Sequence, residues 1–431
     1  MSYFKKHPFA SLFLAGLTLR LLLLFIDFSF DVNNHISWAQ DAYNRGLPGF
    51  YETPSTAVFA HRFPNYPPLS IFMFIPFYVL REFIFNLAWQ ANLAIPLFPS
   101  NIIPFLESRA FMAGVFKIPG LISDFALAWT LYVFAKKVIP KKKKLHIVSA
   151  ALVLFHPTIF YNSSFWGQID AIPILFTLIA VYLLLYTKRF LTSATSLMIA
   201  LLIKPTMLVY VPVYALVFVK KHGAKKSLYA GLVSVILFWV SFLPFFSQGS
   251  VLLFPFQVYA HKILTAQSIS FVSNSAYNAW TLNPALMQVQ DAASFLAGLS
   301  YRIIGFAVTA VIFIVLLKKL YQRKLTGFAV LFALSLSAYT AFLFMTKMHE
   351  RYMILIILPL LIPALKDKSL RKPWIVVSVV SFINLYKSFS VPSIPGAVDV
   401  LNSNPVVFVL SLINIAVYIY LFKRFIFAKP R

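Results

Sequence analysis

Long apolar runs alternate with short polar stretches along almost the whole chain. A membrane-spanning helix needs roughly 20 consecutive apolar residues, and many of these runs approach that length. The pattern therefore predicts an all-α polytopic membrane protein with about 12 transmembrane helices (12 to 14) in a single domain over residues 1–431. The expected spans are 8–26, 109–134, 145–163, 170–187, 190–203, 206–219, 227–246, 301–317, 326–345, 352–365, 373–391 and 405–422.

Two long segments interrupt this alternation. Residues 27–69 are rich in acids, aromatic side chains and turn formers, and residues 247–300 mix aromatic and amide side chains. After the first of them, the apolar region 66–107 is interrupted by six prolines and the pair Arg81-Glu82. We expect 66–107 to lie along the membrane surface, with a single crossing over 109–134; three crossings between residues 66 and 134 are the alternative.

Composition and charge agree with a membrane protein. The chain is 60% hydrophobic and 12% charged, and its formal net charge is +26. Most of the 38 Lys and Arg residues fall in short clusters between or beside the apolar runs, as in cytoplasmic loops. This placement predicts cytoplasmic N and C termini, and it assigns the basicity to topology and not to nucleic-acid binding.

The acids are placed differently. If the basic clusters are cytoplasmic, only Asp367 lies in a basic loop, while eight of the 12 acids fall on the opposite face. A catalytic surface on the outer face is the simplest explanation. The sequence contains no cysteine, so disulfides and thiolate metal sites are excluded.

The first outer segment, 27–69, carries the best candidates for chemistry. Residues 31–45 have the pattern of a short amphipathic juxtamembrane helix, with Asp31 able to cap its N-terminus. His35 and Trp38 follow on the same helix face, and Asp27 lies four residues upstream. Asp31 is therefore either a helix cap or a functional acid, and the nearby His favours the second interpretation.

Three further polar groups lie at the outer ends of predicted spans, where polar side chains often serve function. The turn 165–170 reads Phe-Trp-Gly-Gln-Ile-Asp, in which Asp170 is either a helix cap or a site residue. Lys204-Pro205 marks a predicted hairpin tip. Residues 347–351 read Lys-Met-His-Glu-Arg, which suits a bound phosphate; anchoring of Lys347 and Arg351 at the lipid headgroups is the alternative.

The ordered set of motifs resembles the GT-C superfamily of integral-membrane glycosyltransferases, which use polyprenyl-phosphate-linked sugars as donors. It is most similar to the lipid-linked-oligosaccharide glucosyl- and mannosyltransferases and to the glycosylphosphatidylinositol mannosyltransferases. The likeness covers residues 1 to about 365 and rests on an acid after the first span, Asn-Tyr-Pro-Pro-Leu-Ser (65–70), Phe-Trp-Gly-Gln-Ile-Asp (165–170), Ile-Lys-Pro (203–205), Asn-Ala-Trp (278–280) and Met-His-Glu-Arg-Tyr-Met (348–353).

The resemblance implies a GT-C-like fold in which Asp31 is the general base of an inverting hexosyltransferase. It implies that His349 and Arg351 approach the donor phosphate, and we add Lys204 and Lys347 to that group. The expected supporting residues are Asp27, His35, Trp38, Tyr66, Trp166, Gln168, Asp170 and Glu350.

The chain departs from relatives with paired adjacent acids, because Asp27 and Asp31 are four residues apart. We therefore predict no metal site and no cofactor, with a divalent metal as the alternative. The implied partners are a polyprenyl-phosphate hexose (mannose or glucose), a glycan, lipid or protein acceptor, and the bilayer. The implied location is the plasma membrane of a prokaryote, with the site on the extracytoplasmic face. A transporter or lipid-linked-sugar flippase without transferase activity is the rival hypothesis.

Overall fold

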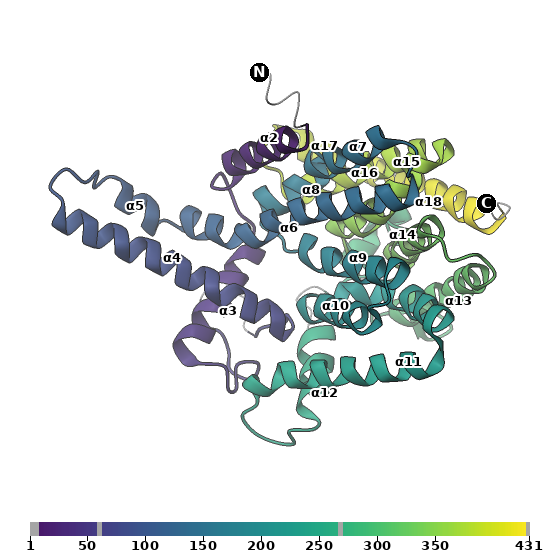
Figure 1. The fold of residues 1–431 in the computed structure, drawn as a ribbon, viewed down its shortest axis with the longest axis horizontal. Coiled ribbons are helices and arrows are strands. Elements are labelled where there is room, and N and C mark those ends of the chain that lie inside the picture. Colours follow the sequence, from purple (N-terminus) through teal and green to yellow (C-terminus); the bar gives the residue numbers. More distant parts are fainter. Residues whose placement is uncertain (1–7, 58–62, 266–269, 428–431) are drawn as a thin grey trace.

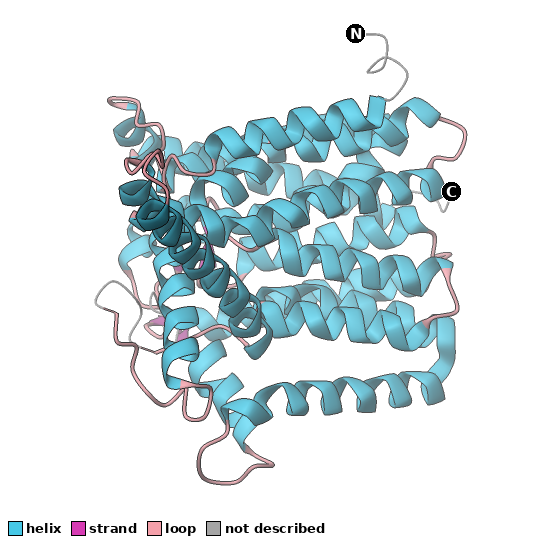
Figure 2. Cartoon of the chain, turned by 60° about the vertical axis from the view of Figure 1, so that its left-hand side comes forward, coloured by secondary structure: helices cyan, strands magenta, loops and turns pink. Residues whose placement is uncertain are grey.

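The computed structural model describes residues 8–57, 63–265 and 270–427, and it is 76% helical with almost no strand. Most helices lie roughly side by side in one bundle (Figures 1 and 2). The prediction of an all-α chain with several helices long and apolar enough to span a membrane is confirmed. The residues at the two termini lie outside the described ranges, so the predicted placement of the termini is untested.

Fewer helices than expected meet the length and apolarity of a membrane span. Six do so among the described residues, or seven if the bent pair Lys143–Leu154 and Pro157–Trp166 forms one span. The predicted count of 12 is not reached. The predicted spans 206–219 and 227–246 count together as the stretch Pro205–Phe245, although the helix breaks between them at Gly223. Other predicted spans are helical but short, such as Ala171–Tyr186 and Phe190–Ile203.

The N-terminal third contains α2 (Pro8–Leu23), α3 (Phe30–Arg45) and a helical hairpin of α4 (Pro68–Ala94) and α5 (Ile102–Glu107). We expected prolines to break residues 66–107, but 27 of them form one helix. Pro67 and Pro68 occupy its start, where proline needs no hydrogen-bond donor, and Pro76 is accommodated inside it. The hairpin projects from the bundle (Figure 1).

The next elements form the framework of the site. They include a long helix, a π-helical turn and two short antiparallel helices that pack closely on each other. In order they are α6 (Arg109–Val138), α7 (Lys143–Leu154), α8 (Pro157–Phe160), η1 (Tyr161–Trp166), α9 (Ala171–Tyr186) and α10 (Phe190–Ile203).

The middle of the chain begins with a helix that leaves helical geometry at Gly223, where φ is +78°. The segment 247–300, expected as a long loop, contains short helices and strands. The elements are η2 (Pro205–Tyr210), α11 (Val211–Phe242), η3 (Leu243–Phe245), α12 (Phe254–Val258), η4 (Tyr259–Leu264), β1 (Ser273–Asn274), η5 (Trp280–Leu282), η6 (Pro284–Gln288), β2 (Ser294–Leu296) and β3 (Leu299–Ser300).

The C-terminal third supplies the centre of the bundle, because α14 and α15 are buried along almost their whole length. Strand β4 pairs in parallel with β1 and so joins the 247–300 segment to the His349 region. The elements are α13 (Tyr301–Tyr321), α14 (Gly327–Phe344), β4 (Met348–His349), η7 (Glu350–Met353), α15 (Ile354–Lys366), η8 (Lys368–Leu370), α16 (Arg371–Ser388), α17 (Ala397–Asn402) and α18 (Asn404–Phe427).

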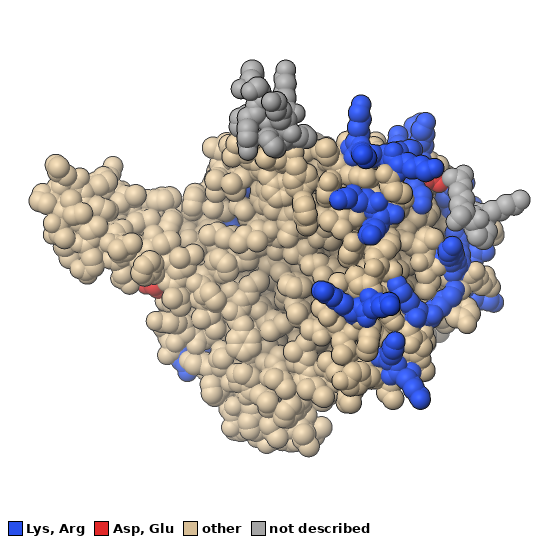
Figure 3. Space-filling view, in the orientation of Figure 1, with Lys and Arg blue, Asp and Glu red and all other residues tan. Residues whose placement is uncertain are grey.

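Lys and Arg side chains gather at one end of the bundle (Figure 3). The candidate site residues lie at the opposite ends of the same helices. Helix α9 begins beside Asp170 and ends near Lys188, while α10 begins beside Arg189 and ends at Lys204. The fold therefore separates the basic loops from the candidate site by the length of a helix.

Candidate functional site

Asp31 lies in the first turn of α3 but does not cap it. Ser29 occupies the N-cap position, and no side chain makes a capping hydrogen bond there. The Asp31 carboxylate instead accepts a hydrogen bond from Gln168 and forms an ion pair with Arg351. Both contacts use Oδ2, and no described residue is hydrogen-bonded to Oδ1. The cap interpretation of Asp31 is therefore wrong in this structure.

The turn 165–170 is shaped by Gly167, whose backbone has φ of +81°. A Cβ at this position would lie 2.3 Å from Val32 Cγ2, so a larger residue would push α3 away. The close approach brings Gln168 onto Asp31. Asp170 occupies the N-cap position of α9 without capping it, because its carboxylate receives hydrogen bonds from Lys204 and Asn162.

Buried ion pairs link four segments of the chain. Lys204 Nζ lies 2.5 Å from Asp170 Oδ1. Arg351 places Nη2 at 3.5 Å from Asp31 Oδ2, Nη1 at 2.9 Å from Glu350 Oε1 and Nε at 3.8 Å from Asp170 Oδ2. Arg351 is therefore the hub of a network in which Arg351 and Lys204 contact three carboxylates.

His349 lies beside this network at the end of β4. Its Nδ1 is 3.7 Å from Glu350 Oε2, and its Nε2 is 3.3 Å from Asn274 Nδ2. Asn274 belongs to β1, which pairs with β4. The distant 247–300 segment thus holds the ring of His349 in place.

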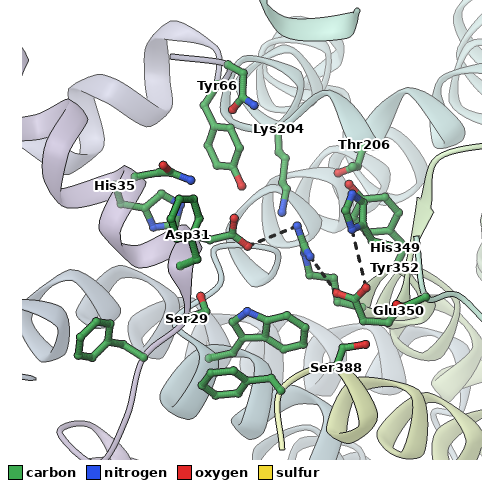
Figure 4. Close-up of a pocket in the computed structure, with 18 of the residues that line it drawn as sticks. Ser29, Asp31, His35, Tyr66, Lys204, Thr206, His349, Glu350, Tyr352 and Ser388 are labelled. Atoms are coloured by element: carbon green, nitrogen blue, oxygen red, sulfur yellow. Dashed lines mark hydrogen bonds and ion pairs between the residues drawn. The ribbon is translucent and has the colours of Figure 1, made fainter. Parts of the chain in front are cut away.

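These groups surround one cavity of about 460 Å³, called the site cavity below. Figure 4 shows Asp31 between His35 on one side and His349 on the other. We call Lys204, His349 and Arg351 the cation wall and His35, Trp38, Asn65 and Tyr66 the aromatic wall. The other lining residues are Phe28, Ser29, Phe30, Asp31, Asn34, Trp166, Pro205, Thr206, Ile263, Ser275, Glu350, Tyr352, Ser388 and Phe389.

The surroundings of Asp31 and Glu350 lower their pKa values, and burial lowers the pKa of His35. Burial raises the pKa of Asp31, but Arg351 and the hydrogen bond from Gln168 outweigh it and lower that pKa to about 2. Glu350 also has a lowered pKa, because His349 and Arg351 outweigh the effect of its burial. Burial lowers the pKa of His35 to about 3, so its imidazole is neutral at pH 7.

Four predicted site residues lie outside the lining of the site cavity. Gln168 and Asp170 contact the lining residues Asp31 and Lys204, whereas Lys347 and Asp27 have other partners. Lys347, expected at the donor phosphate, lies 4.0 Å from Asp291, which also pairs with Arg302. Asp27 accepts a hydrogen bond from the Phe28 backbone N–H at 2.7 Å. Both residues are close in sequence to the site, but their side chains have other partners. The remaining predicted residues line the cavity.

Sequence reasoning missed several residues that build the site. Ser388 and Phe389, at the end of α16, line the cavity although no motif was seen after about residue 365. Asn274, in the 247–300 segment, contacts His349 and is not among the predicted site residues. Buried Lys117 in α6 donates hydrogen bonds to the carbonyls of Leu24 and Asp27, just before α3. A single lysine in an apolar helix is the signal that could have identified Lys117.

The carboxylates of the site are held by cationic side chains. Among the residues that the structure describes, no group of three or more His, Asp or Glu side chains is arranged to hold a metal ion. Asp31, Asp170 and Glu350 instead share Arg351. The contacts of these carboxylates are therefore ion pairs and hydrogen bonds.

Comparisons with known proteins assign no family to this chain. No family model matches the sequence, and no curated protein matches it. The functional argument therefore rests on the motifs and on the geometry of the site cavity.

Proposed function

We propose that this chain is an inverting, GT-C-like membrane glycosyltransferase. It transfers a hexose, mannose or glucose, from a polyprenyl-phosphate donor to an acceptor hydroxyl, and it belongs to the plasma membrane of a prokaryote. In this proposal the basic loops and both termini are cytoplasmic, and the site cavity opens on the extracytoplasmic side. Twelve membrane crossings would then require the shorter apolar helices to span together with the six long ones.

The observation that carries the proposal is the juxtaposition of Asp31 with Arg351 at one cavity. An acid that can accept a proton and a guanidinium that can hold a phosphate lie 3.5 Å apart at their nearest atoms. They come from residues 320 positions apart in the chain, on α3 and η7. A glycosyl transfer with a phosphate leaving group needs this pair of groups close together.

Asp31 acts as the base in the proposed reaction. Its Oδ1 accepts the proton from the acceptor hydroxyl while the hydroxyl oxygen attacks the anomeric carbon. Arg351 and Gln168 hold Oδ2 and so orient the carboxylate. With a pKa of about 2, Asp31 is ionised but weakly basic. A donor phosphate that competes for Arg351 would weaken this ion pair and raise the pKa of Asp31.

The cation wall acts on the leaving group. As the bond from the anomeric carbon to the phosphate oxygen breaks, negative charge grows on the polyprenyl phosphate, and Arg351, Lys204 and His349 stabilise it. Because attack and departure occur on opposite sides of the anomeric carbon, one displacement inverts its configuration. Glu350 and Asp170 hold Arg351 and Lys204 in position.

A transporter is the alternative, and it would place acids along a path through the bundle. One acid, Asp124 in α6, is buried there. It forms an ion pair at 2.9 Å with Arg20 and accepts a hydrogen bond from Ser163 at 2.6 Å. Both partners are buried, and neither lines the site cavity. These contacts support a packing role for Asp124.

The test is a transfer assay with purified protein. Synthetic polyprenyl-phosphate mannose and glucose are each supplied with glycan acceptors, and the products are identified by mass spectrometry and anomeric NMR. The proposal expects one donor to be consumed with inversion, and it expects Asp31→Asn to form product at least about 100-fold more slowly. Donor flipping in vesicles without any sugar transfer would overturn it in favour of the transporter.

A further inference from the structure

The aromatic wall contains several buried polar atoms without partners. Among the residues that the structure describes, no hydrogen bond is made by Nδ1 or Nε2 of His35, Nε1 of Trp38 or Oδ1 of Asn65. His35 and Trp38 are each 1% exposed. Buried polar atoms are normally paired, so atoms of this kind lining one cavity indicate a ligand that pairs with them.

The rings of this wall are held firmly, so they can act as a preformed surface. The imidazole of His35 stacks on Phe74 with ring centroids 4.4 Å apart. Tyr66 lies 5.5 Å from His35 and 5.3 Å from Trp38, measured between ring centroids. The backbone carbonyl of Tyr66 accepts a hydrogen bond from Tyr51 at 2.8 Å.

The unpaired atoms differ in whether they donate or accept hydrogen bonds, and this difference indicates the kind of ligand that fits them. Trp38 can only donate, Asn65 Oδ1 can only accept, and a neutral imidazole does one of each. A phosphate offers mainly acceptors and would leave the accepting atoms without a donor. Hydroxyl groups both donate and accept, and a sugar ring adds an apolar face that packs on aromatic side chains.

The position of these residues in the cavity indicates which substrate carries the bound sugar. Asp31 lies between His35 and His349 (Figure 4). In an in-line displacement the attacking hydroxyl and the leaving phosphate are on opposite sides of the anomeric carbon. If the phosphate lies beside His349, the acceptor approaches from the side of His35.

We propose that His35, Trp38, Asn65 and Tyr66 form a binding subsite for an uncharged sugar residue of the acceptor, so that the acceptor is a glycan. The assignment of this sugar to the acceptor rests on the function proposed above. The presence of a neutral-sugar subsite does not depend on that function, because it is inferred from the unpaired atoms and the fixed rings alone.

The test measures sugar binding without catalysis. Saturation-transfer NMR with methyl mannoside and methyl glucoside is applied to the full-length protein in detergent, and to His35→Phe and Trp38→Phe. These substitutions keep a ring but remove the hydrogen bonds, and each lost bond should weaken binding about tenfold. His156→Phe is the matched control, because His156 is also buried with an unpaired Nδ1 but lies outside the cavity lining.

The outcomes separate the two proposals. Binding that falls at least about tenfold in both variants, but not in His156→Phe, supports the subsite even if no transfer is ever detected. Equal binding by all four proteins, or no binding by the wild type, overturns the subsite and leaves the transferase proposal standing. If the variants lose affinity for a polyprenyl-phosphate sugar and keep their affinity for acceptor glycans, the wall binds the donor, and the acceptor assignment is wrong.

Discussion

Replacement of Asp31 by Asn tests the central claim about the site. Asn has the size and shape of Asp and can still accept the hydrogen bond from Gln168, but it cannot accept the proton of a hydroxyl group. We expect Asp31→Asn to fold, to bind a polyprenyl-phosphate sugar with near-normal affinity, and to transfer the sugar at least about 100-fold more slowly.

The magnitude distinguishes a base from an ion-pair partner. The Asp31 side chain is 25% exposed and lies 3.5 Å from Arg351, so this pair contributes roughly 1 kcal/mol or less to stability. Arg351 also keeps its contacts with Glu350 and Asp170 in the variant. Loss of a general base costs about 100-fold to 10,000-fold in rate, which is about 2.7 to 5.5 kcal/mol in the barrier.

The assay compares initial rates of transfer at saturating donor, with donor affinity and thermal stability measured on the same samples. Asp41→Asn is the matched control, since Asp41 is a second acid on α3 whose carboxylate pairs with Ser55, Thr56 and Arg45 and does not line the cavity. The control should transfer within a few-fold of wild type. If Asp31→Asn does so too, Asp31 is not the base and the proposed mechanism fails.

Three other predictions concern the donor site, the topology and the pH dependence of stability. Arg351→Ala should weaken binding of the polyprenyl-phosphate donor about 10-fold to 100-fold, as measured by calorimetry. Lys347→Ala should not weaken it, because of these two residues only Arg351 lines the cavity. Equal losses in the two variants would refute the assignment of Arg351 to the donor phosphate. The chain has no cysteine, so in whole cells an impermeant maleimide should label Ser250→Cys and leave Lys225→Cys unlabelled until permeabilisation; the reverse would invert the topology. The pKa of His35 is lowered from 6.5 to about 3, so only the unfolded state takes up this proton as the pH falls below about 6.5. The wild-type protein should therefore lose stability as the pH falls, by up to about 1.4 kcal/mol per pH unit, and His35→Phe should lose less. If the melting temperatures of the two proteins change equally with pH, the prediction is wrong.

The helical character of the chain, with several helices long and apolar enough to span a membrane, was predictable because it depends on local properties. Apolar runs must satisfy their backbone hydrogen bonds internally in a bilayer, so they form helices wherever they are long enough. Even the amphipathic helix after the first span was predicted within one residue of its start, as 31–45 against Phe30–Arg45. Its His35 and Trp38 share a buried face, as helical spacing requires.

The prolines of the 66–107 region show where local reasoning failed. Proline was expected to break the segment, but its effect depends on its position within a helix. At the first turn of α4 it removes no hydrogen bond, and after Ala94 it no longer matters to that helix. The count of spans failed for a related reason, since the boundaries of short and kinked helices depend on their neighbours.

The partners of the charged side chains were decided by tertiary structure alone. Lys347 and Arg351 are four residues apart in one motif, yet Lys347 pairs with Asp291 while Arg351 joins Asp31, Asp170 and Glu350. Sequence spacing cannot distinguish them, because the choice depends on which distant segments pack beside each side chain. Ion pairs between residues far apart in the chain form only after the bundle has brought four segments to one cavity, so the sequence determined the chemical groups of the site and the fold determined their arrangement.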